Sequence, residues 1–574
     1  MAIMEILQVK QLSFAYPDEQ HQVLNDITFT VHAGDFVVLC GASGCGKTTL
    51  LRQLKPELTP VGQIGGTVYY NGSLLNELPA HQSAQEIGMV FQNPDNSIVM
   101  DLVWHELSFG MENLGYSLPV MRSRLAEIAQ FFGLEPLLYK PIHELSGGQK
   151  QLLNLASVLL LQPKVLLLDE PTSQLDPVAA REFISMVYRL NREFSTTVII
   201  SEHRLEEVIP LADQMILLEK GKLKYSGSPR EVSEQIQQNN LDHTQLLHNL
   251  SDDFKYLPSV TQLFWTMQTQ STNKDQRIPL TVREGKQWLQ TFQWNHDREV
   301  NSVIIHLLTS LSDVEAIKPS LAKEKIVLEC REVTFQYEKK SAEVLKKLDL
   351  QIYKGEMLAI LGGNGAGKST LLQLLAGLLQ PRRGKVKLAD HIKIGYLAQN
   401  PLLYFSHDTV AEELSTAAHY AGVTEPEVVI AKLMKQLQLE GLEQKHPHDI
   451  SGGQQQKTAL AIVLLLNPDI LLLDEPTKGL DPLAKIALAQ QLLDLREAGH
   501  TIVIVTHDVE FAASYSSRCA MLFDGMITAT DVPSTFFSEN VFYTTAVNRV
   551  VRDWLPGILT AEEVLKLWHA PDSG

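Results

Sequence analysis

GASGCGKTT at residues 41–49 and GGNGAGKST at residues 362–370 are the stretches of this sequence that decide its fold. An apolar run precedes each one, and a leucine-containing segment of helical type follows it. The glycines let backbone amides approach phosphate oxygens, and the lysine reaches the β and γ phosphates of a nucleotide. Each stretch therefore predicts a strand, a phosphate-binding loop and a helix, in that order.

The two stretches belong to a tandem repeat, because three further motifs recur in the same order. Ser146 precedes Asp169 by 23 residues (169 − 146), and Ser451 precedes Asp474 by the same interval (474 − 451). The recurring motifs are LSGGQ (145–149) and ISGGQ (450–454), VLLLDEPT (165–172) and ILLLDEPT (470–477), and SEH (201–203) and THD (506–508). The chain therefore contains two copies of one domain.

Short apolar runs rich in β-forming residues alternate with helical segments in both copies. DFVVLC and VLLLDE in the first copy match EMLAILG and ILLLDE in the second, and such runs are typical of buried parallel strands. The predicted fold class is α/β, with two tandem P-loop domains. From the loop lysine to the next motif glutamine there are 45 residues in the first copy (92 − 47) and 31 in the second (399 − 368). This difference predicts a deletion in an early sheet or loop of the second copy.

The composition limits the class of protein. At about 150 residues per domain, 574 residues predict about four compact units. The 49 Lys and Arg against 67 Asp and Glu give a net charge of −18, which argues against a chain that wraps nucleic acid. The four cysteines form no CxxC pair, which argues against a disulfide framework or a zinc ribbon. No apolar run reaches the ~18 residues that span a bilayer, so we expect a cytosolic chain unless a partner holds it to a membrane.

Acidic residues at the end of one strand in each copy supply the chemistry of a nucleotide hydrolase. Asp169 and Asp474 end apolar runs, where a carboxylate can hold Mg²⁺ through water. Glu170 and Glu475 follow directly and can polarise an attacking water. The loop residues that complete this chemistry are Lys47 and Lys368, which reach the phosphates, and Thr48 and Ser369, which bind Mg²⁺.

Together these motifs resemble those of the ATP-binding cassette (ABC) ATPases, and the resemblance covers both halves of the chain. It implies RecA-like domains, each with a helical signature subdomain, and ATP and Mg²⁺ as cofactors. It also implies that Gln92 and Gln399 contact the metal and couple it to a transport partner. The switch histidines that contact the γ phosphate are implied to be His203 and His507, and Tyr16 and Tyr337 are implied to stack on adenine. The other implied ATP-binding residues are Gly41, Ser43, Gly44, Gly46, Thr49, Ser146, Gly147, Gly148, Gln149, Gly362, Asn364, Gly365, Gly367, Thr370, Ser451, Gly452, Gly453 and Gln454.

In this family the two cassettes pair head to tail, and the resemblance implies the same pairing within this chain. The loops that cross to the facing domain would end at Asp176 and Asp481. Each nucleotide would then lie between one glycine loop and the opposite signature. One site would combine Lys47, Asp169, Glu170 and His203 with Ser451, and the other Lys368, Asp474, Glu475 and His507 with Ser146. Because both sets are complete, we predict two competent sites.

Two positions depart from the expected pattern. Lys478 occupies a crossing-loop position where the family has a small residue and the first copy has Ser173. It is either an ordinary solvated lysine or part of an interface that distinguishes the two sites. Cys45 lies inside the first glycine loop, where the second copy has Ala366. It is either merely small or a thiol with a lowered pKa.

The segment between the cassettes discriminates between classes of twin-cassette protein. Residues 236–325 hold nine Lys or Arg and ten Asp or Glu, which does not match the basic linker of ribosome-associated twin ATPases. IPLTVREGKQWL (278–289) has an echo in GILTAEEVLKLW (557–568), and both show an L-T-x-x-E helix start. The expected parts are a first ABC ATPase domain (1–235), a small appended segment and linker (236–325), a second ABC ATPase domain (326–535) and a C-terminal helical tail (536–574).

Such tails, together with VFQNPDNSIV (90–99) and ELSFGMEN (106–113), resemble the energy-coupling-factor ATPases, although Ser97 replaces that family's usual glutamine. The resemblance implies an ATPase that energises a bacterial importer for a vitamin or a metal. The fused arrangement resembles the type associated with thiamine or hydroxymethylpyrimidine uptake. The alternatives are a soluble translation-associated twin ATPase and a sugar-type importer ATPase.

The energy-coupling-factor reading carries expectations about partners. The chain would be peripheral on the cytoplasmic face of the cell membrane. Its partners would be an integral membrane scaffold, the T component, and a substrate-binding membrane subunit, with no nucleic acid. Arginine-bearing helices of the scaffold would dock in grooves beside the glutamine loops. The candidate acceptors are Asp95, Asp101, Glu106, Asp408, Glu412 and Glu413.

Overall fold

The computed structural model describes residues 4–17, 21–241, 252–268, 277–295, 325–339, 341–541 and 543–568. The chain divides into two compact units, Met1–Pro258 and Ser259–Gly574. Residues 242–251, 269–276 and 296–324 of the expected linker lie outside the described residues, so its near-neutral charge balance cannot be placed in the fold. The four-part division remains a prediction; helix α8 (Pro229–Leu241) crosses its first boundary.

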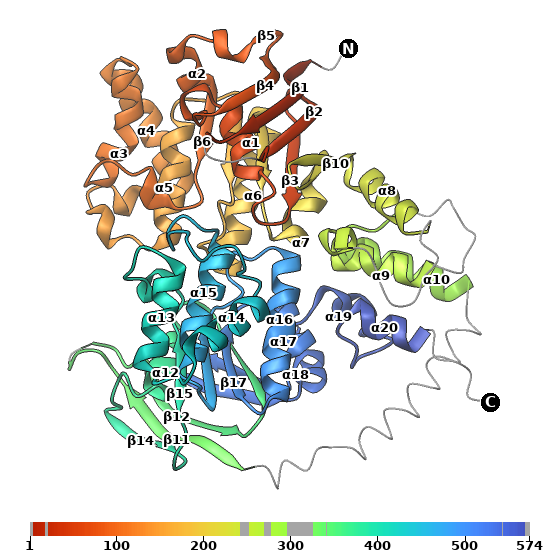
Figure 1. Cartoon of the computed structure of the whole chain (residues 1–574). Helices are drawn as coiled ribbons and strands as arrows, with labels where there is room; N and C mark the ends of the chain where they lie inside the picture. The colour runs from red at the N-terminus through yellow and green to blue at the C-terminus, as the bar shows by residue number, and fades with distance from the viewer. Residues whose placement is uncertain are drawn as a thin grey trace. The chain divides into compact units, whose positions relative to one another are not determined.

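The first unit contains two sheets (Figure 1). The larger has the order β10-β9-β3-β8-β7-β6 and is parallel except for its edge strand β10. The smaller is antiparallel, in the order β2-β1-β4-β5. The strands are β1 (Glu5–Ala15), β2 (Leu24–His32), β3 (Phe36–Gly41), β4 (Gln63–Tyr70), β5 (Ser73–Leu74), β6 (Ile87–Val90), β7 (Val165–Asp169), β8 (Thr197–Ser201), β9 (Gln214–Glu219) and β10 (Lys222–Gly227).

The buried strands of the parallel sheet are the apolar runs that the sequence shows. Every residue of β3, β7 and β8 is buried, as expected for strands covered on both faces. Helices α3 and α4 pack against α5, which starts at the S-G-G-Q motif and forms the helical subdomain. The other helices of this unit join or cover the strands. The helices are α1 (Lys47–Gln53), α2 (Ala80–Glu86), α3 (Val103–Asn113), α4 (Leu118–Phe132), α5 (Gly147–Leu159), α6 (Pro177–Phe194), α7 (Leu205–Val208) and α8.

The second unit repeats this architecture with one shortened part. Its larger sheet has the order β15-β16-β17-β13-β18-β19, parallel except for β19. Its antiparallel sheet has three strands among the described residues, β12-β11-β14, and lacks counterparts of β5 and α2. This confirms the deletion expected between the glycine loop and the glutamine. The strands are β11 (Ile326–Phe335), β12 (Leu345–Tyr353), β13 (Met357–Leu361), β14 (Arg383–Leu388), β15 (Ile394–Leu397), β16 (Ile470–Asp474), β17 (Thr501–Thr506), β18 (Arg518–Phe523) and β19 (Met526–Asp531).

The helices of the second unit fall into two groups. One group belongs to the cassette, where α13 and α14 pack against the signature helix α15. The other is a bundle of four helices, which we call the appendage bundle: α9, α10, α19 and α20. The cassette helices are α12 (Lys368–Leu375), α13 (Val410–Tyr420), α14 (Pro426–Gln436), α15 (Gly452–Leu465), α16 (Pro482–Glu497), α17 (Val509–Tyr515) and α18 (Pro533–Glu539); the bundle helices are α9 (Ser259–Gln268), α10 (Val282–Asn295), α19 (Ala546–Val551) and α20 (Ala561–Trp568).

The appendage bundle joins the segments that follow the two cassettes. Helix α9 packs on α20, and α10 packs on α19, so each pair combines one helix from each segment. The two L-T-x-x-E helix starts are confirmed. Glu284 accepts from the Leu280 amide at 2.8 Å and Glu563 accepts from the Leu559 amide at 2.7 Å. The core of the bundle is Val260, Leu263, Phe264, Met267, Ile278, Trp288, Leu289, Val547, Val550, Val551, Leu555 and Val564.

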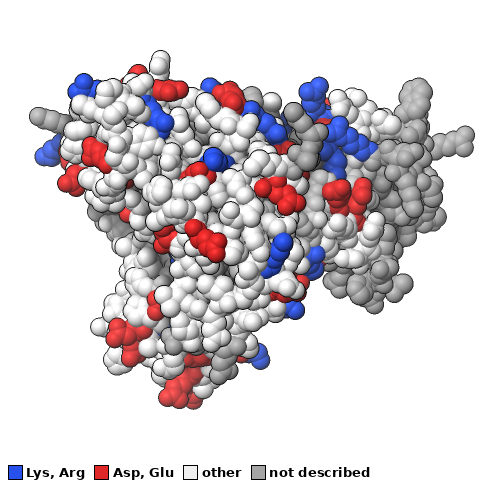
Figure 2. Space-filling model, turned by 90° about the horizontal axis from the view of Figure 1, so that it is seen from above, with Lys and Arg blue, Asp and Glu red and all other residues white. Residues whose placement is uncertain are grey.

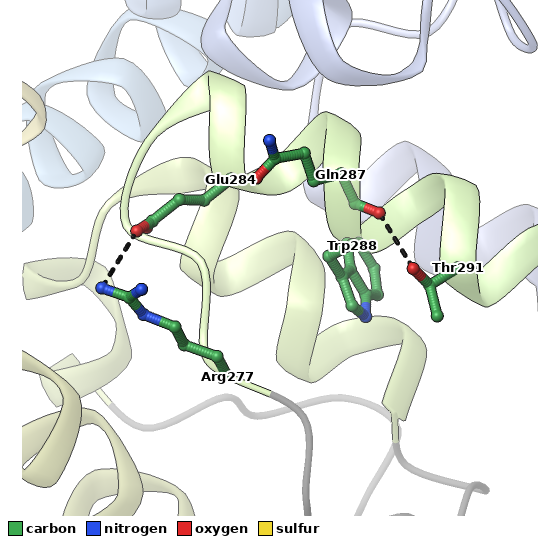
Figure 3. Close-up of a pocket in the computed structure, with 5 residues that line it drawn as sticks. All are labelled: Arg277, Glu284, Gln287, Trp288 and Thr291. Carbon is green, nitrogen blue, oxygen red and sulfur yellow. Dashed lines mark hydrogen bonds and ion pairs between the residues drawn. The ribbon is translucent and has the colours of Figure 1, made fainter.

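A hollow of about 260 Å³ opens beside α10 (Figure 3). Arg277 forms an ion pair with Glu284 at its rim (3.5 Å), and the Thr291 hydroxyl donates to the Gln287 carbonyl (3.2 Å). Trp288 also lines it. The hollow shares no residue with the expected nucleotide sites.

Charged side chains are scattered over the face that Figure 2 shows, with acidic and basic groups interspersed among uncharged ones. The net charge of −18 therefore does not gather into one acidic field on this face. Within the described part of the chain, no helix combines the length and the apolar character needed to cross a membrane.

Candidate nucleotide sites

The two glycine loops have the same backbone. Gly46 (φ 103°) and Gly367 (φ 99°) lie in the left-handed region at the starts of α1 and α12. A Cβ atom on Gly46 would lie 2.8 Å from Leu24 Cδ2, and one on Gly367 would lie 2.8 Å from Leu345 Cδ2. Both positions therefore require glycine for conformation and for space.

The loop lysines and the loop tips lie as a phosphate site requires. Lys47 Nζ donates to the carbonyls of Gly41 (2.9 Å) and Ala42 (3.1 Å), and its side chain is 5% exposed. Lys368 Nζ makes the same bonds to Gly362 and Gly363 (2.9 and 3.2 Å). The exposed tips of the loops are Ser43 and Gly44 in the first cassette and Asn364 and Gly365 in the second.

The expected adenine-stacking tyrosines lie against the same loops. The Tyr16 hydroxyl is 3.3 Å from Thr49 Oγ1, and the Tyr337 hydroxyl is 2.9 Å from Thr370 Oγ1. Tyr337 is 60% exposed, so its ring is available for stacking.

The two strand-ending aspartates fit a Mg²⁺ ion. Asp169 accepts from Thr48 Oγ1 at 3.1 Å and from Ser201 Oγ at 2.9 Å. Burial raises the pKa of both Asp169 and Asp474. Asp474 Oδ1 is buried and has no hydrogen-bond partner among the described residues, which suits a carboxylate that completes its bonding with a cation or its water. Among the described residues, no group of three or more His, Cys, Asp or Glu lies together as a metal site.

The glutamates that follow have strained backbones. Glu170 (φ 44°) and Glu475 (φ 51°) both lie in the left-handed region, which costs non-glycine residues free energy. Glu170 Oε1 lies 2.8 Å from His203 Nε2, and Glu170 Oε2 accepts from Gln92 Nε2 at 2.8 Å. The structure thus brings together three residues of the first predicted catalytic set.

In the second cassette the corresponding carboxylate lies beside a histidine and a lysine. Glu475 lies 2.8 Å from His507 Nδ1 and 3.6 Å from Lys368 Nζ. Burial alone would raise the pKa of Glu475, but the His507 hydrogen bond and the charges of His507 and Lys368 outweigh it and leave the pKa lowered. An ionised carboxylate is the form that can polarise a water molecule.

The strand registers correct one motif comparison. SEH and THD do not correspond letter by letter: Asp169 pairs with Ser201, whereas Asp474 pairs with Val505. The histidines therefore coincide, and Glu202 coincides with Thr506. The shift arises because the interval between paired strand starts is one residue shorter in the second copy, Ile470 to Thr501 against Val165 to Thr197.

The signature motifs start helices with complete capping boxes. The Ser146 amide donates to Gln149 Oε1 (3.0 Å), while the Gln149 amide donates to Ser146 Oγ (3.3 Å). Ser451 and Gln454 make the same pair of bonds (2.9 and 3.4 Å). Gly147 and Gly452, the first helical residues, have open space where a Cβ would lie, and Gly148 and Gly453 follow them. Each motif thus offers a helix start to an anion.

The loops after the acidic strands end on helix caps. Asp176 and Asp481 each accept from two amides of the helix that follows.

Lys478 is half-buried, and its charge acts to lower the pKa of Asp474 against the burial that raises it. Cys45 is 5% exposed and packs in the core of its unit, as a small apolar residue would.

Two of the six candidate acceptors for a membrane partner are corrected. Glu106 is 5% exposed and accepts from the amides of Val99 (3.0 Å) and Met100 (2.8 Å). Glu413 is 4% exposed and accepts from the amides of Ser406 and His407. Both carboxylates hold the loop that precedes their helix and are unavailable to a partner. The four exposed candidates are Asp95, Asp101, Asp408 and Glu412, of which Asp95 also pairs with Lys150 (2.6 Å).

Sequence reasoning missed an aromatic anchor in the second cassette. The Tyr404 hydroxyl donates to the Tyr396 carbonyl (2.8 Å) and accepts from the Ala398 amide (2.9 Å), so it fixes the chain just before Gln399. The phenol of Tyr396 lies close enough to Asp474 for that charge, added to burial, to raise the pKa of Tyr396 to about 12. The sign of this anchor in the sequence is that the second copy diverges from the first after QNP.

Comparisons with known proteins agree with this geometry. The family model described as "ABC transporter" matches residues 24–173 and 345–478. A protein of Bacillus thuringiensis subsp. konkukian, provisionally named an ABC transporter ATP-binding protein, is 44% identical over 97% of each chain. One of Streptomyces coelicolor with the same kind of name is 33% identical over 96% of this chain and 98% of its own.

Two solved structures are also similar. An archaeal ribosome recycling factor, aABCE1, solved with a ribosomal stalk protein, aligns with 92% of this chain and 91% of its own at a TM-score of 0.57 and 19% identity, which shows a shared fold. The cbiO1 protein of Clostridium perfringens, part of an ABC transporter complex, is 30% identical over 42% of this chain and 97% of its own, at a TM-score of 0.37.

Proposed function

The chain belongs to the ABC transporter family of ATP-binding proteins, and we propose that it is the ATP-hydrolysing subunit of an importer of the energy-coupling-factor type. ATP hydrolysis is the activity of the family. The finer assignment, to uptake of a metal or of a vitamin such as a thiamine precursor, rests on one observation. Each cassette is followed by a tail with the same L-T-x-x-E helix start, and the two tails build one bundle.

Within each cassette, the proposed division of labour follows the contacts. The buried lysine, Lys47 or Lys368, would contact the β and γ phosphates. The carboxylate of Glu170 or Glu475 would accept a proton from the attacking water, and the neighbouring histidine would hold that carboxylate and the γ phosphate in place. Mg²⁺, bound by Thr48 and Asp169 or by Ser369 and Asp474 with the glutamines Gln92 and Gln399 nearby, would neutralise phosphate charge.

The proposal includes partners outside the chain. We place the chain peripherally on the cytoplasmic face of a bacterial membrane, bound to an integral membrane scaffold and a substrate-binding subunit. A basic segment of the scaffold would meet exposed carboxylates, and Asp101 and Asp408 are exposed at corresponding positions of the two cassettes. The signature serines Ser146 and Ser451 would each complete the site of the other cassette, as the resemblance implies.

The test is copurification from the native host. The tagged chain is isolated from membranes solubilised in mild detergent, and copurifying integral membrane proteins are identified by mass spectrometry. We expect a multi-spanning scaffold together with a small substrate-binding membrane protein. Copurification with ribosomal proteins instead would favour the translation-associated alternative. Copurification with the membrane subunits of a sugar transporter would favour the sugar-type importer ATPase.

A pair of charge reversals sharpens this test. Asp101→Arg combined with Asp408→Arg should reduce recovery of the scaffold several-fold, because two exposed carboxylates become repulsive. Glu193→Arg on α6, also exposed (49%), is the matched control and should leave recovery unchanged. If the double variant recovers as much scaffold as the control does, the proposed docking position is wrong, but the transporter assignment is unaffected.

A further inference from the structure

We infer that Glu202 is a positioning residue that joins the switch histidine of the first cassette to its crossing loop, and that the second cassette replaces this carboxylate with a single neutral hydroxyl. The inference needs only the ATP hydrolysis that the family performs, so it does not depend on which membrane partner the chain serves. All the residues concerned lie in the first unit, and their counterparts lie in the second.

The Glu202 side chain is the centre of a buried set of hydrogen bonds. It follows β8 directly and is 3% exposed. Oε1 accepts from the Thr172 amide (3.0 Å) and from the Thr172 hydroxyl (2.5 Å). Oε2 accepts from the His203 amide (3.0 Å) and from the Arg204 amide (3.4 Å). One carboxylate therefore ties the first residue of the crossing loop to the backbone of the switch histidine.

A second bond joins the same two segments. Arg204 Nη2 donates to the Leu175 carbonyl at 2.8 Å, near the end of the crossing loop. His203 in turn lies 2.8 Å from the catalytic carboxylate Glu170. A displacement of the crossing loop in the first cassette is thus transmitted to His203 through two bridges rather than through solvent.

The second cassette joins its switch segment to a different part of the fold. Thr506 replaces Glu202; its hydroxyl lies 3.3 Å from the Thr477 hydroxyl and accepts from the Asp508 amide (3.0 Å), so one neutral group stands where the first cassette has a carboxylate that accepts four hydrogen bonds. Asp508 replaces Arg204, and it accepts from Lys485 on α16 (2.6 Å) and from the Phe511 amide on α17 (3.0 Å). Neutral hydroxyls therefore join this switch segment to its crossing loop, and a charged pair joins it to α16.

This difference gives the two cassettes unequal roles. The first site is the one whose water-positioning residues respond to the crossing loop. Since a small displacement of a catalytic group can cost a large part of the rate, loss of Glu202 should impair turnover without impairing ATP binding. Glu202 does not contact the nucleotide, so it acts through His203 and Thr172.

The experiment uses the full chain and four variants. Glu202→Thr installs the residue of the second cassette. Glu202→Gln keeps the size of the side chain but puts an amide nitrogen against N–H donors. Thr172→Val removes the Thr172 hydroxyl that donates to Glu202. Thr477→Val is the matched control in the second cassette. Steady-state ATP hydrolysis of the first-cassette variants is measured in a Glu475→Gln background, so that turnover comes from the first cassette, and Thr477→Val is measured in a Glu170→Gln background, so that turnover comes from the second. ATP affinity is measured with a fluorescent nucleotide.

We expect Glu202→Thr and Glu202→Gln to lower kcat by about tenfold with ATP affinity changed less than about twofold. Thr172→Val should lower kcat less, and combined with Glu202→Thr it should add nothing further, because both break the same link. If Glu475→Gln alone abolishes turnover, the two sites hydrolyse ATP only together. The Glu202 variants are then compared in a chain that keeps Glu475, and we expect the same loss of kcat.

Three results would overturn the inference. One is an unchanged kcat in Glu202→Thr. Another is a fall of kcat and ATP affinity in proportion to a lowered melting temperature, which would indicate a purely structural residue. The last is an equal loss in Thr477→Val, because the link would then not distinguish the cassettes. Should Glu202→Gln fail to fold, Thr172→Val still decides the question through the same readouts.

Discussion

The two cassettes share one glycine-loop geometry but hold their glutamine loops differently. In the first, Gln92 Nε2 donates to the carboxylate of Glu170, the proposed catalytic base, at 2.8 Å. In the second, the hydroxyl of Tyr404, which stands where the first copy has Ser97, makes two hydrogen bonds to the backbone just before Gln399. The phosphate-binding parts thus stayed alike after duplication, while the loops that would couple the sites to a partner diverged.

The appended segments show the same pattern of likeness and divergence. Both start a helix with a Thr–Glu capping pair. The residue after the glutamate is Gly285 in one segment and the buried Val564 in the other. Helix α10 therefore crosses its neighbours closely at a point where α20 presents a side chain.

The largest expected effect tests whether both sites hydrolyse ATP. The double variant Glu170→Gln, Glu475→Gln should lower kcat about 10²-fold or more, because both carboxylates that accept a proton from water are lost. Steady-state phosphate release measures it. Each single variant should lose at least half the rate. Full wild-type rate in either single variant would contradict the prediction of two competent sites.

A smaller effect on stability is expected in the appendage bundle. A Cβ atom on Gly285 would lie 2.5 Å from Val260 Cγ1 and 3.0 Å from Val550 Cγ2. Gly285→Ala should therefore destabilise the bundle by about 1–3 kcal/mol, seen as a lowered melting temperature. Gly557→Ala, where a Cβ meets nothing within 4 Å, is the control and should change little. Equal stability of the two variants would mean that the close crossing of α10 is wrong.

The glutamine loops give a prediction about rate. Gln92→Ala removes a direct hydrogen bond to Glu170 and should lower kcat about tenfold, the equivalent of about 1.4 kcal/mol. Gln399→Ala should have a smaller effect, since Tyr404 rather than Gln399 anchors that loop. ATPase assays of the two variants side by side check it. A larger loss in Gln399→Ala would reverse the comparison.

The smallest expected effect concerns the tyrosine anchor. Tyr404→Phe removes one hydroxyl that makes two backbone hydrogen bonds and should cost about 1 kcal/mol of stability. Chemical unfolding followed by fluorescence measures it, with Tyr420→Phe as the control because Tyr420 is 84% exposed. No difference between the two would show that the anchor contributes nothing to the loop.

Most of the fold was predicted from short local motifs. Buried runs such as VLLLD predicted the parallel strands, because a strand covered on both faces must be apolar throughout. The interval between Lys368 and Gln399 predicted the shortened antiparallel sheet. By contrast, the acidic candidates Glu106 and Glu413 looked like surface groups in the sequence, since nothing local shows that their carboxylates fold back onto the preceding loop.

By itself, the sequence determined that this protein has two nucleotide cassettes and where their glycine loops and acidic strands lie, and it predicted two complete catalytic sets. These features are encoded in short contiguous motifs whose backbone needs are local, as Gly46 and Gly367 show. Only the tertiary structure decided that Glu202 coincides with Thr506, that Tyr404 anchors one glutamine loop, and that the two tails form one bundle. Each depends on strand register or on contacts between segments far apart in the chain, which single-sequence spacing cannot specify.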